Sequence, residues 1–100
     1  MKKLAAILIL IALSGCTSIR AGIADVQGFS HCEDVPQVDF REFAHDDFDV
    51  VRDICGPRAG GCAFWTGLTP LDSCTIHYEK GDEYTRRHEC HHCAVGSFHP

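Results

Sequence analysis

Two histidines and a glutamate lie close together in the last part of the sequence, at His88, Glu89 and His92. On a helix, residues four positions apart lie roughly 40° apart around the axis, so His88 and His92 can bind one metal ion. Glu89 lies about 100° from His88, where it is free to act on a bound water molecule. The pattern His-Glu-x-x-His therefore predicts a zinc site with Glu89 as the general base.

The start of the chain predicts export. A basic beginning is followed by a short apolar run, Leu4 to Leu13, which is typical of a secretory signal and too short to span a membrane. Leu13-Ser14-Gly15-Cys16 closely resembles the lipobox of bacterial lipoproteins. The resemblance implies cleavage after residue 15 and lipidation of Cys16, with several acyl chains as a stable anchor. An ordinary cleaved signal and an uncleaved N-terminal helix are the alternatives.

The resemblance also implies a location. Thr17, rather than aspartate, follows the cysteine, which in Gram-negative bacteria favours the outer membrane. We therefore expect a chain in the bacterial cell envelope, lipid-anchored to the outer membrane and facing the periplasm. Its expected partners are the membrane, through the lipid, and a peptide or protein substrate.

Without residues 1–15, seven Lys and Arg remain against fourteen Asp and Glu. The net charge of −7 argues against a nucleic-acid partner.

The remaining 85 residues suffice for one small domain, which usually needs disulfides or a metal for stability. An even number of further cysteines in an exported chain predicts a disulfide framework with fifteen conceivable pairings. These cysteines are Cys32, Cys55, Cys62, Cys74, Cys90 and Cys93.

The first half of this mature chain predicts a tether and two short elements. Residues 16–30, the lipidated start and a small, polar segment, are expected to have little structure, and the domain is expected to cover residues 31–100. Alternating residues at 38–43 predict a short edge strand. Acids followed by apolar residues at helical spacing, closed by Gly56, predict a helix over 46–56, with a second strand as the alternative.

The second half predicts a hairpin and a helix. Residues 61–66 and 73–78 are rich in aromatic, β-branched and cysteine residues, and the Gly- and Pro-containing connector favours an antiparallel pair. Asp82 or Thr85 could cap a helix over 83–95 that ends at Gly96. The fold class is therefore small α+β, a short antiparallel sheet or hairpin packed on the motif helix and stapled by disulfides. The aromatic residues expected in its core are Phe40, Phe43, Phe48, Phe64 and Trp65.

A strand directly before a helix with His-Glu-x-x-His resembles the core of the zincin metallopeptidases, so residues 31–100 are interpreted as a minimal zincin-like domain. The resemblance implies that His88 and His92 bind zinc and that Glu89 polarises the zinc-bound water. In that family, the strand beside the active helix pairs with an extended substrate.

The third zinc ligand is expected to be His99. The metzincin subgroup of zincins has a glycine and a third histidine after the motif, and here both come one residue later, at Gly96 and His99. Glycine permits the turn that would bring His99 back to the metal, and catalytic zinc needs three protein ligands plus water. His77, Glu79 and His91 are the other candidates.

Zinc bound in this way predicts hydrolysis of a peptide or amide bond. Glu89 would accept a proton from the attacking water and return it to the leaving amine. Tyr78, Tyr84 or His91 could donate a hydrogen bond to the oxyanion, and the sequence does not discriminate among them.

Other classes of function use the same residues. Cys90 and Cys93 form a Cys-x-x-Cys pair, as in thiol-disulfide proteins, and with His92 they could hold a structural metal. A non-catalytic, disulfide-stapled metal-binding or structural lipoprotein is the main alternative. Both cysteines lie on the helix face away from the two histidines, so we expect bonds to the hairpin or to the 46–54 helix rather than to each other. A bond between Cys62 and Cys74 across the hairpin is a further option.

Overall fold

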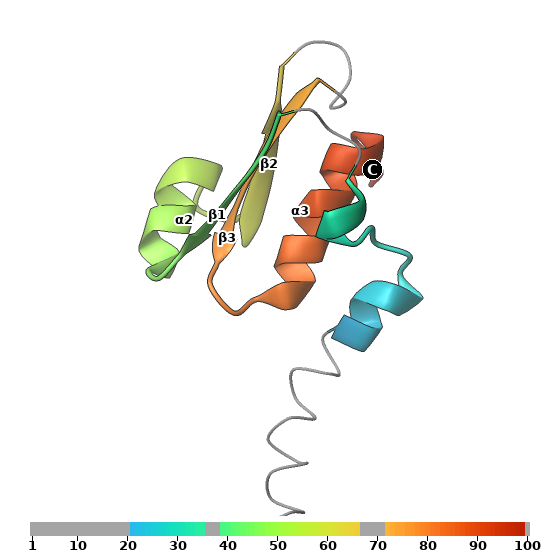
Figure 1. The fold of residues 1–100 in the computed structure, drawn as a ribbon. Coiled ribbons are helices and arrows are strands. Elements are labelled where there is room, and N and C mark those ends of the chain that lie inside the picture. Colours follow the sequence, from blue (N-terminus) through green and yellow to red (C-terminus); the bar gives the residue numbers. More distant parts are fainter. Residues whose placement is uncertain (1–20, 36–38, 67–71, 100) are drawn as a thin grey trace, which may run out of the picture.

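The structure, a computed structural model, describes residues 21–35, 39–66 and 72–99; the predicted signal and Cys16 lie outside these ranges. Within them, no helix combines the length and the apolar character needed to cross a membrane. The elements follow the order of a small α+β protein (Figure 1). They are the 3-10 helix η1 (Cys32–Asp34), β1 (Asp39–His45), α2 (Phe48–Cys55), β2 (Gly61–Trp65), β3 (Ser73–Glu79) and α3 (Glu83–Val95).

The three strands form one mixed sheet in the order β1-β3-β2. The predicted hairpin is confirmed, because β2 pairs with β3 in antiparallel register. The predicted edge strand is also confirmed, as β1, but it runs parallel to β3. The expectation of a purely antiparallel sheet is therefore wrong. The chain passes through α2 and β2 between β1 and β3, and this long crossover is what a parallel pair requires.

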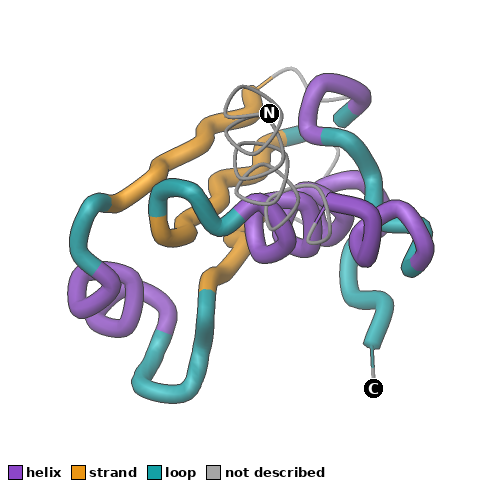
Figure 2. Tube along the Cα trace, turned by 90° about the horizontal axis from the view of Figure 1, so that it is seen from below, coloured by secondary structure: helices purple, strands orange, loops and turns teal. Residues whose placement is uncertain are grey.

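Helices lie on both sides of this sheet, with α2 on one face and α3 on the other (Figures 1 and 2). Alternate residues of β3 are buried, and Cys74, Ile76 and Tyr78 share one buried cluster with Cys90 and Cys93 of α3. The intervening residues of β3 point to the α2 face, because successive side chains of a strand alternate.

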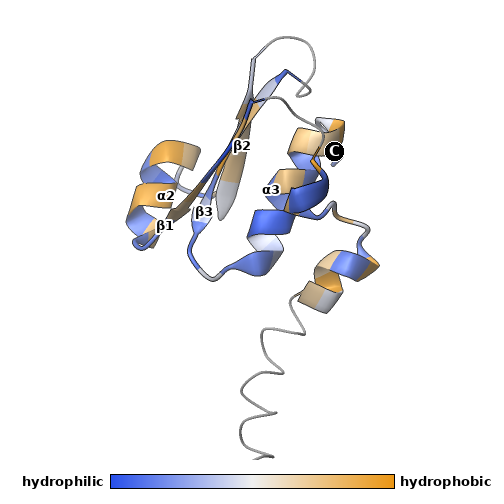
Figure 3. Ribbon diagram, in the orientation of Figure 1, coloured by the Kyte–Doolittle hydropathy of each residue, from blue (hydrophilic) through white to orange (hydrophobic). Residues whose placement is uncertain are grey.

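The aromatic residues divide between core and surface. Phe40 and Trp65 pack against the buried cluster. The expectation that Phe43, Phe48 and Phe64 are core residues is wrong, because they are 45%, 37% and 49% exposed. α2 is short and amphipathic, whereas the first turns of α3 are hydrophilic (Figure 3). Eight residues of α2 cannot cover the whole outer face of the sheet, so the rings of Phe43 and Phe64 stay exposed. Phe48 lies on α2 itself, where the guanidinium of Arg52 lies over its ring.

Both helices have the predicted ends. Asp82 caps α3 by accepting a hydrogen bond from the backbone N–H of Thr85, and Gly96 ends the helix with φ of 82°. Asp47 caps α2 in the same way, through the N–H of Asp49, and Gly56 follows its last residue. The helix predicted over 46–56 is thus confirmed in preference to the alternative strand.

Three disulfides staple the fold. Cys74–Cys93 joins β3 to α3, as expected for the hairpin and the motif helix. Cys32–Cys90 joins η1 to α3, so the expectation that Cys90 bonds to the hairpin or to the 46–54 helix is wrong. Cys55–Cys62 joins α2 to β2. The suggested Cys62–Cys74 bond across the hairpin is wrong. Trp65, not Cys62, is the register partner of Cys74, and Cys62 lies on the opposite face of the sheet.

The segment before η1 packs against α3. Residues 21–26 are helical, and Ala24 and Phe29 are buried, so the expectation of little structure over 16–30 is wrong for residues 21–30. The side chain of Arg87 on α3 is only 5% exposed. Its guanidinium donates hydrogen bonds to the carbonyls of Ala21 and Phe29 and to the carboxylate of Asp25. A buried, fully used arginine of this kind fixes the whole segment to the helix.

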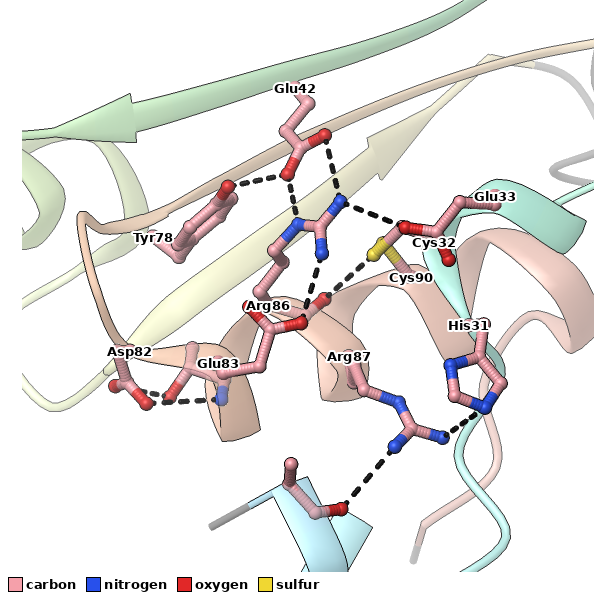
Figure 4. A network of polar contacts seen from close by, with 12 residues as sticks. His31, Cys32, Glu33, Glu42, Tyr78, Asp82, Glu83, Arg86, Arg87 and Cys90 are labelled. Atoms are coloured by element: carbon pink, nitrogen blue, oxygen red, sulfur yellow. Dashed lines mark hydrogen bonds and ion pairs between the residues drawn. A yellow bond between two sulfur atoms is a disulfide. The ribbon is translucent and has the colours of Figure 1, made fainter. Parts of the chain in front are cut away.

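A second arginine ties α3 to the sheet (Figure 4). Arg86 donates to the carboxylates of Glu42 on β1 and of Glu83 one turn back on its own helix. Tyr78 on β3 also donates its hydroxyl to Glu42. Burial alone would raise the pKa of Glu42, but these hydrogen bonds outweigh it and lower the pKa. β1, β3 and α3 therefore meet at one ionised carboxylate.

The disulfide between sheet and motif helix is expected to contribute more stability than the one that holds α2. Cys74 and Cys93 are 19 residues apart, and the paired substitution Cys74→Ala/Cys93→Ala should lower the free energy of unfolding by about 3 kcal/mol. Cys55→Ala/Cys62→Ala opens a bond across 7 residues and should cost about 2 kcal/mol. Guanidinium unfolding of both variants measures the difference. A larger loss for the second pair would contradict this ranking.

Candidate metal centre

Three histidines converge at one end of α3. His88 and His92 lie on successive turns of the helix, and His99 returns to them after the helix ends. One nitrogen from each lies within 4.8 Å of the other two, so the group could hold a metal ion. The Nε2 atoms of His92 and His99 are 3.0 Å apart. Ligands on tetrahedral zinc lie roughly 3.3 Å apart, so only small ring movements separate this arrangement from a coordinating one.

The hydrogen bond at His92 leaves the correct nitrogen for a metal. Its Nδ1 is 2.9 Å from the backbone carbonyl of Gly96. A carbonyl can only accept, so Nδ1 carries the proton and the neutral ring presents the Nε2 lone pair toward His99. This is the arrangement of metal-binding histidines, whose second nitrogen commonly donates to a carbonyl or carboxylate.

His88 is neutral near physiological pH. Burial, followed by the neighbouring His92 and His99, lowers the pKa of His88 from 6.5 to about 4. Burial is also the main cause of the lowered pKa of His92. Since metal ligation requires the unprotonated imidazole, the packing of the site favours the form that binds.

Glu89 is the most unusual carboxylate of the described residues. Its side chain is 7% exposed, and Oε1 lies 3.9 Å from Nε2 of His88. Burial raises the pKa of Glu89 from 4.5 to about 7. A carboxylate with a pKa near neutrality can both take up and release a proton at physiological pH, which a general base needs.

These side chains line one open cleft between β2 and α3, with a volume of about 450 Å³. The indole of Trp65 stacks near His92 at one end, with ring centroids 6.3 Å apart. The cleft is lined by Gly60, Gly61, Cys62, Ala63, Trp65, Tyr84, Thr85, His88, Glu89, His92 and His99.

Gly61 lets the strand approach the motif helix closely. A Cβ atom at this position would lie 2.6 Å from the side chain of Thr85 and 2.7 Å from the carbonyl oxygen of His77. Neither contact is tolerable for a carbon atom, so the position requires glycine. The same Cβ would lie 3.4 Å from Cγ of Glu89, so the backbone of β2 at Gly61 packs close to the stem of this side chain.

Phe98 is a functional residue that the sequence analysis missed. Its ring centroid lies 4.4 Å from that of His92, 4.6 Å from that of His91 and 5.0 Å from that of His99. It also meets the buried ring of Phe29, at 5.7 Å. This contact holds residues 97–99 against α3 and so positions His99. An aromatic residue beside the third histidine is the only sequence signal for it.

The other candidate ligands lie elsewhere. His91 points to the segment before η1, where its Nδ1 accepts a hydrogen bond from the backbone N–H of Ser30. His77 lies on the α2 face of the sheet and pairs with His45. Glu79, two residues on, shares that face, and neither it nor His77 belongs to a group of three convergent donors within residues 21–35, 39–66 and 72–99.

The cysteines of the Cys-x-x-Cys pair have structural partners. Cys90 and Cys93 are fully buried and bonded to Cys32 and Cys74, not to each other. In this state neither supplies a thiolate for disulfide exchange or for a metal. Of the three residues that could donate a hydrogen bond to the oxyanion, Tyr78, Tyr84 and His91, only Tyr84 lines the cleft. Tyr78 donates its hydroxyl to Glu42 instead.

Comparison of the chain with protein-family models, with curated proteins and with solved structures found no match. The assignment of chemistry to this cleft therefore depends on its own geometry.

Burial of Glu89 is expected to reduce stability in the metal-free protein. Because the folded-state pKa of about 7 is above the ordinary 4.5, stability is lost as the pH rises through this window. Glu89→Gln should therefore raise the free energy of unfolding by about 3 kcal/mol at pH 8 and change it little at pH 4. Denaturant unfolding at both pH values, after chelation of metal, measures this. The exposed Asp53, changed to Asn, is the control, and an equal gain at pH 4 would contradict the interpretation.

Proposed function

We propose that the chain is a zinc-dependent metallopeptidase that hydrolyses peptide or amide bonds with Glu89 as the general base. One observation carries the proposal: three imidazoles within 4.8 Å of one another share a cleft with a buried carboxylate. Three neutral nitrogen donors suit zinc and leave a fourth position open. The donor set thus fits the expected His88, His92 and His99.

Zinc bound there would lower the pKa of water and polarise a substrate carbonyl. The remaining steps belong to the chain. Glu89 accepts a proton from the attacking water, and its surroundings favour the protonated form until the proton passes to the leaving amine. Tyr84, whose hydroxyl now donates to Gln27 at 2.8 Å, is the proposed donor to the oxyanion.

The substrate is proposed to lie along β2. In the zincin family the strand beside the active helix pairs with substrate, but β3, which directly precedes α3, has β1 on one side and β2 on the other. β2 is the outer strand on that side, and residues 60–65 contribute five of the residues that line the cleft. An extended peptide could therefore add to the sheet at the β2 edge, next to the three histidines.

Zinc content and hydrolysis, measured together, test this proposal. Wild type should bind one zinc ion per chain by mass spectrometry, and His99→Ala should bind it at least tenfold more weakly. Glu89→Gln should keep the zinc and lose roughly 1000-fold of its activity on a quenched-fluorescent peptide library, because only the base is removed. Asp53→Asn is the control. The midpoint of the acidic limb in the pH profile of hydrolysis should lie at or below pH 7, because the bound zinc ion would lower the pKa of Glu89.

Three outcomes would contradict the assignment. Hydrolysis retained in Glu89→Gln would refute the role of this carboxylate. Zinc binding without hydrolysis in the wild type would leave a metal-binding lipoprotein, the main alternative class. Zinc binding that is unaffected by His99→Ala would place the third ligand elsewhere.

We further propose that the chain is a lipoprotein of the bacterial cell envelope, anchored at Cys16. The three disulfides support export, because such bonds persist in oxidising compartments. The expected mature chain starts at Cys16 and carries acyl chains, so it should partition into detergent and label with palmitate in bacteria. Cys16→Ala should abolish both. A wild-type chain that retains residues 1–15 and takes up no label would contradict the anchor.

A further inference from the structure

The α2 face of the sheet carries a second pair of histidines, remote from the cleft. His45 ends β1 and His77 lies on the central strand β3, and the sheet separates both from α3. Nε2 of His45 is 2.9 Å from Nδ1 of His77. The rings are almost parallel, with centroids 5.2 Å apart and planes 11° apart. Nothing in the proposed peptidase chemistry uses them.

We propose that His45 and His77 form a second metal site, which takes a divalent transition ion of tetragonal preference, Cu²⁺ most tightly. Copper leads the affinity order of divalent ions for nitrogen donors and favours square arrangements. Two neighbouring ligands of such an ion, with bonds of about 2.0 Å, lie about 2.8 Å apart. The observed separation of 2.9 Å matches this spacing.

The hydrogen bonding of the two rings leaves their outer nitrogens available. The hydrogen bond between them is the single one that the described residues show for either ring, so the outer nitrogens, Nδ1 of His45 and Nε2 of His77, can carry the protons. In the neutral pair, one inner nitrogen carries the shared proton, so metal binding requires that ring to take its other tautomer, with the proton moved through solvent to its outer nitrogen and no net proton released. Each ring also turns away from the line that joins the two inner nitrogens, so that both lone pairs point at one ion.

The backbone and the neighbouring rings hold the pair in place. In the parallel ladder, His77 lies opposite Phe43 and His45 lies opposite Glu79. Phe43 stacks on His77 at 5.1 Å, and Phe64 meets the same ring edge-on at 6.0 Å. The two half-exposed phenylalanines thus flank the pair and limit access of water, which strengthens a metal site.

The outer side of the site remains open for further donors. Glu79 lies opposite His45 in the ladder and shares the face of His77, but its carboxylate does not converge with the two rings, so a further protein ligand would require movement of this side chain. Water or a donor from another molecule would complete the coordination. The proposal is independent of zinc hydrolysis at α3.

Titration of the full chain with CuCl₂, followed by calorimetry and electron paramagnetic resonance, tests the second site. Wild type should bind two equivalents, one at each centre. His77→Gln and His45→Gln should each weaken one equivalent by about 100-fold or more and keep the other. His92→Gln should keep the site on the sheet, whose spectrum should show two coordinated nitrogens.

Thr75→Val is the matched control, because Thr75 lies two residues before His77 on the same face. Circular dichroism verifies folding of each variant, and His45→Gln on the edge strand decides the question if His77→Gln fails to fold. Equal copper binding by wild type and His45→Gln would overturn the proposal. So would a loss of the same size in Thr75→Val. Loss of copper from His92→Gln alone would leave only the centre on α3.

Discussion

Two disulfides within one turn of α3 hold this helix to the sheet and to η1. Cys90 and Cys93 are fully buried, and they share one buried cluster with their partners, Cys32 in η1 and Cys74 in β3. The helix needs these bonds because its first turns are hydrophilic and offer little apolar surface for packing. Arg87 adds a buried polar anchor beside them. The positions of His88 and His92 follow from this attachment.

Covalent attachment at the back of α3 leaves its front free for chemistry. The front carries His88, Glu89 and His92. These residues lower the stability of the folded domain, because neutral imidazoles and a carboxylate are held away from water. Disulfide stabilisation of about 3 to 4 kcal/mol per bond offsets the free-energy cost of holding these polar groups away from water. Stability and the proposed activity thus depend on different faces of the same helix.

The sequence predicts local features well because their causes are local. The caps and Gly96 determine the ends of α3, and alternation with a Gly- and Pro-containing connector determines the hairpin. The parallel placement of β1 was not predictable, since a short alternating strand carries no signal for its direction. Disulfide pairing and the docking of residues 21–30 depend on contacts across the fold, such as those of Arg87 with Ala21 and Phe29. Phe98 was missed for the same reason.

The late spacing of the third histidine has a structural explanation. In the metzincin pattern, glycine follows the second histidine by three residues, whereas here it follows by four. The extra residue lets α3 continue to Val95, and the backbone N–H of Gly96 then donates to the carbonyl of His92. The carbonyl of Gly96 in turn accepts from the ring of His92, so the turn itself orients this ligand. Phe98 then packs beneath the rings and directs His99 back toward them. A helix that continues to Val95 and an aromatic contact therefore bring His99 back to the two rings on α3.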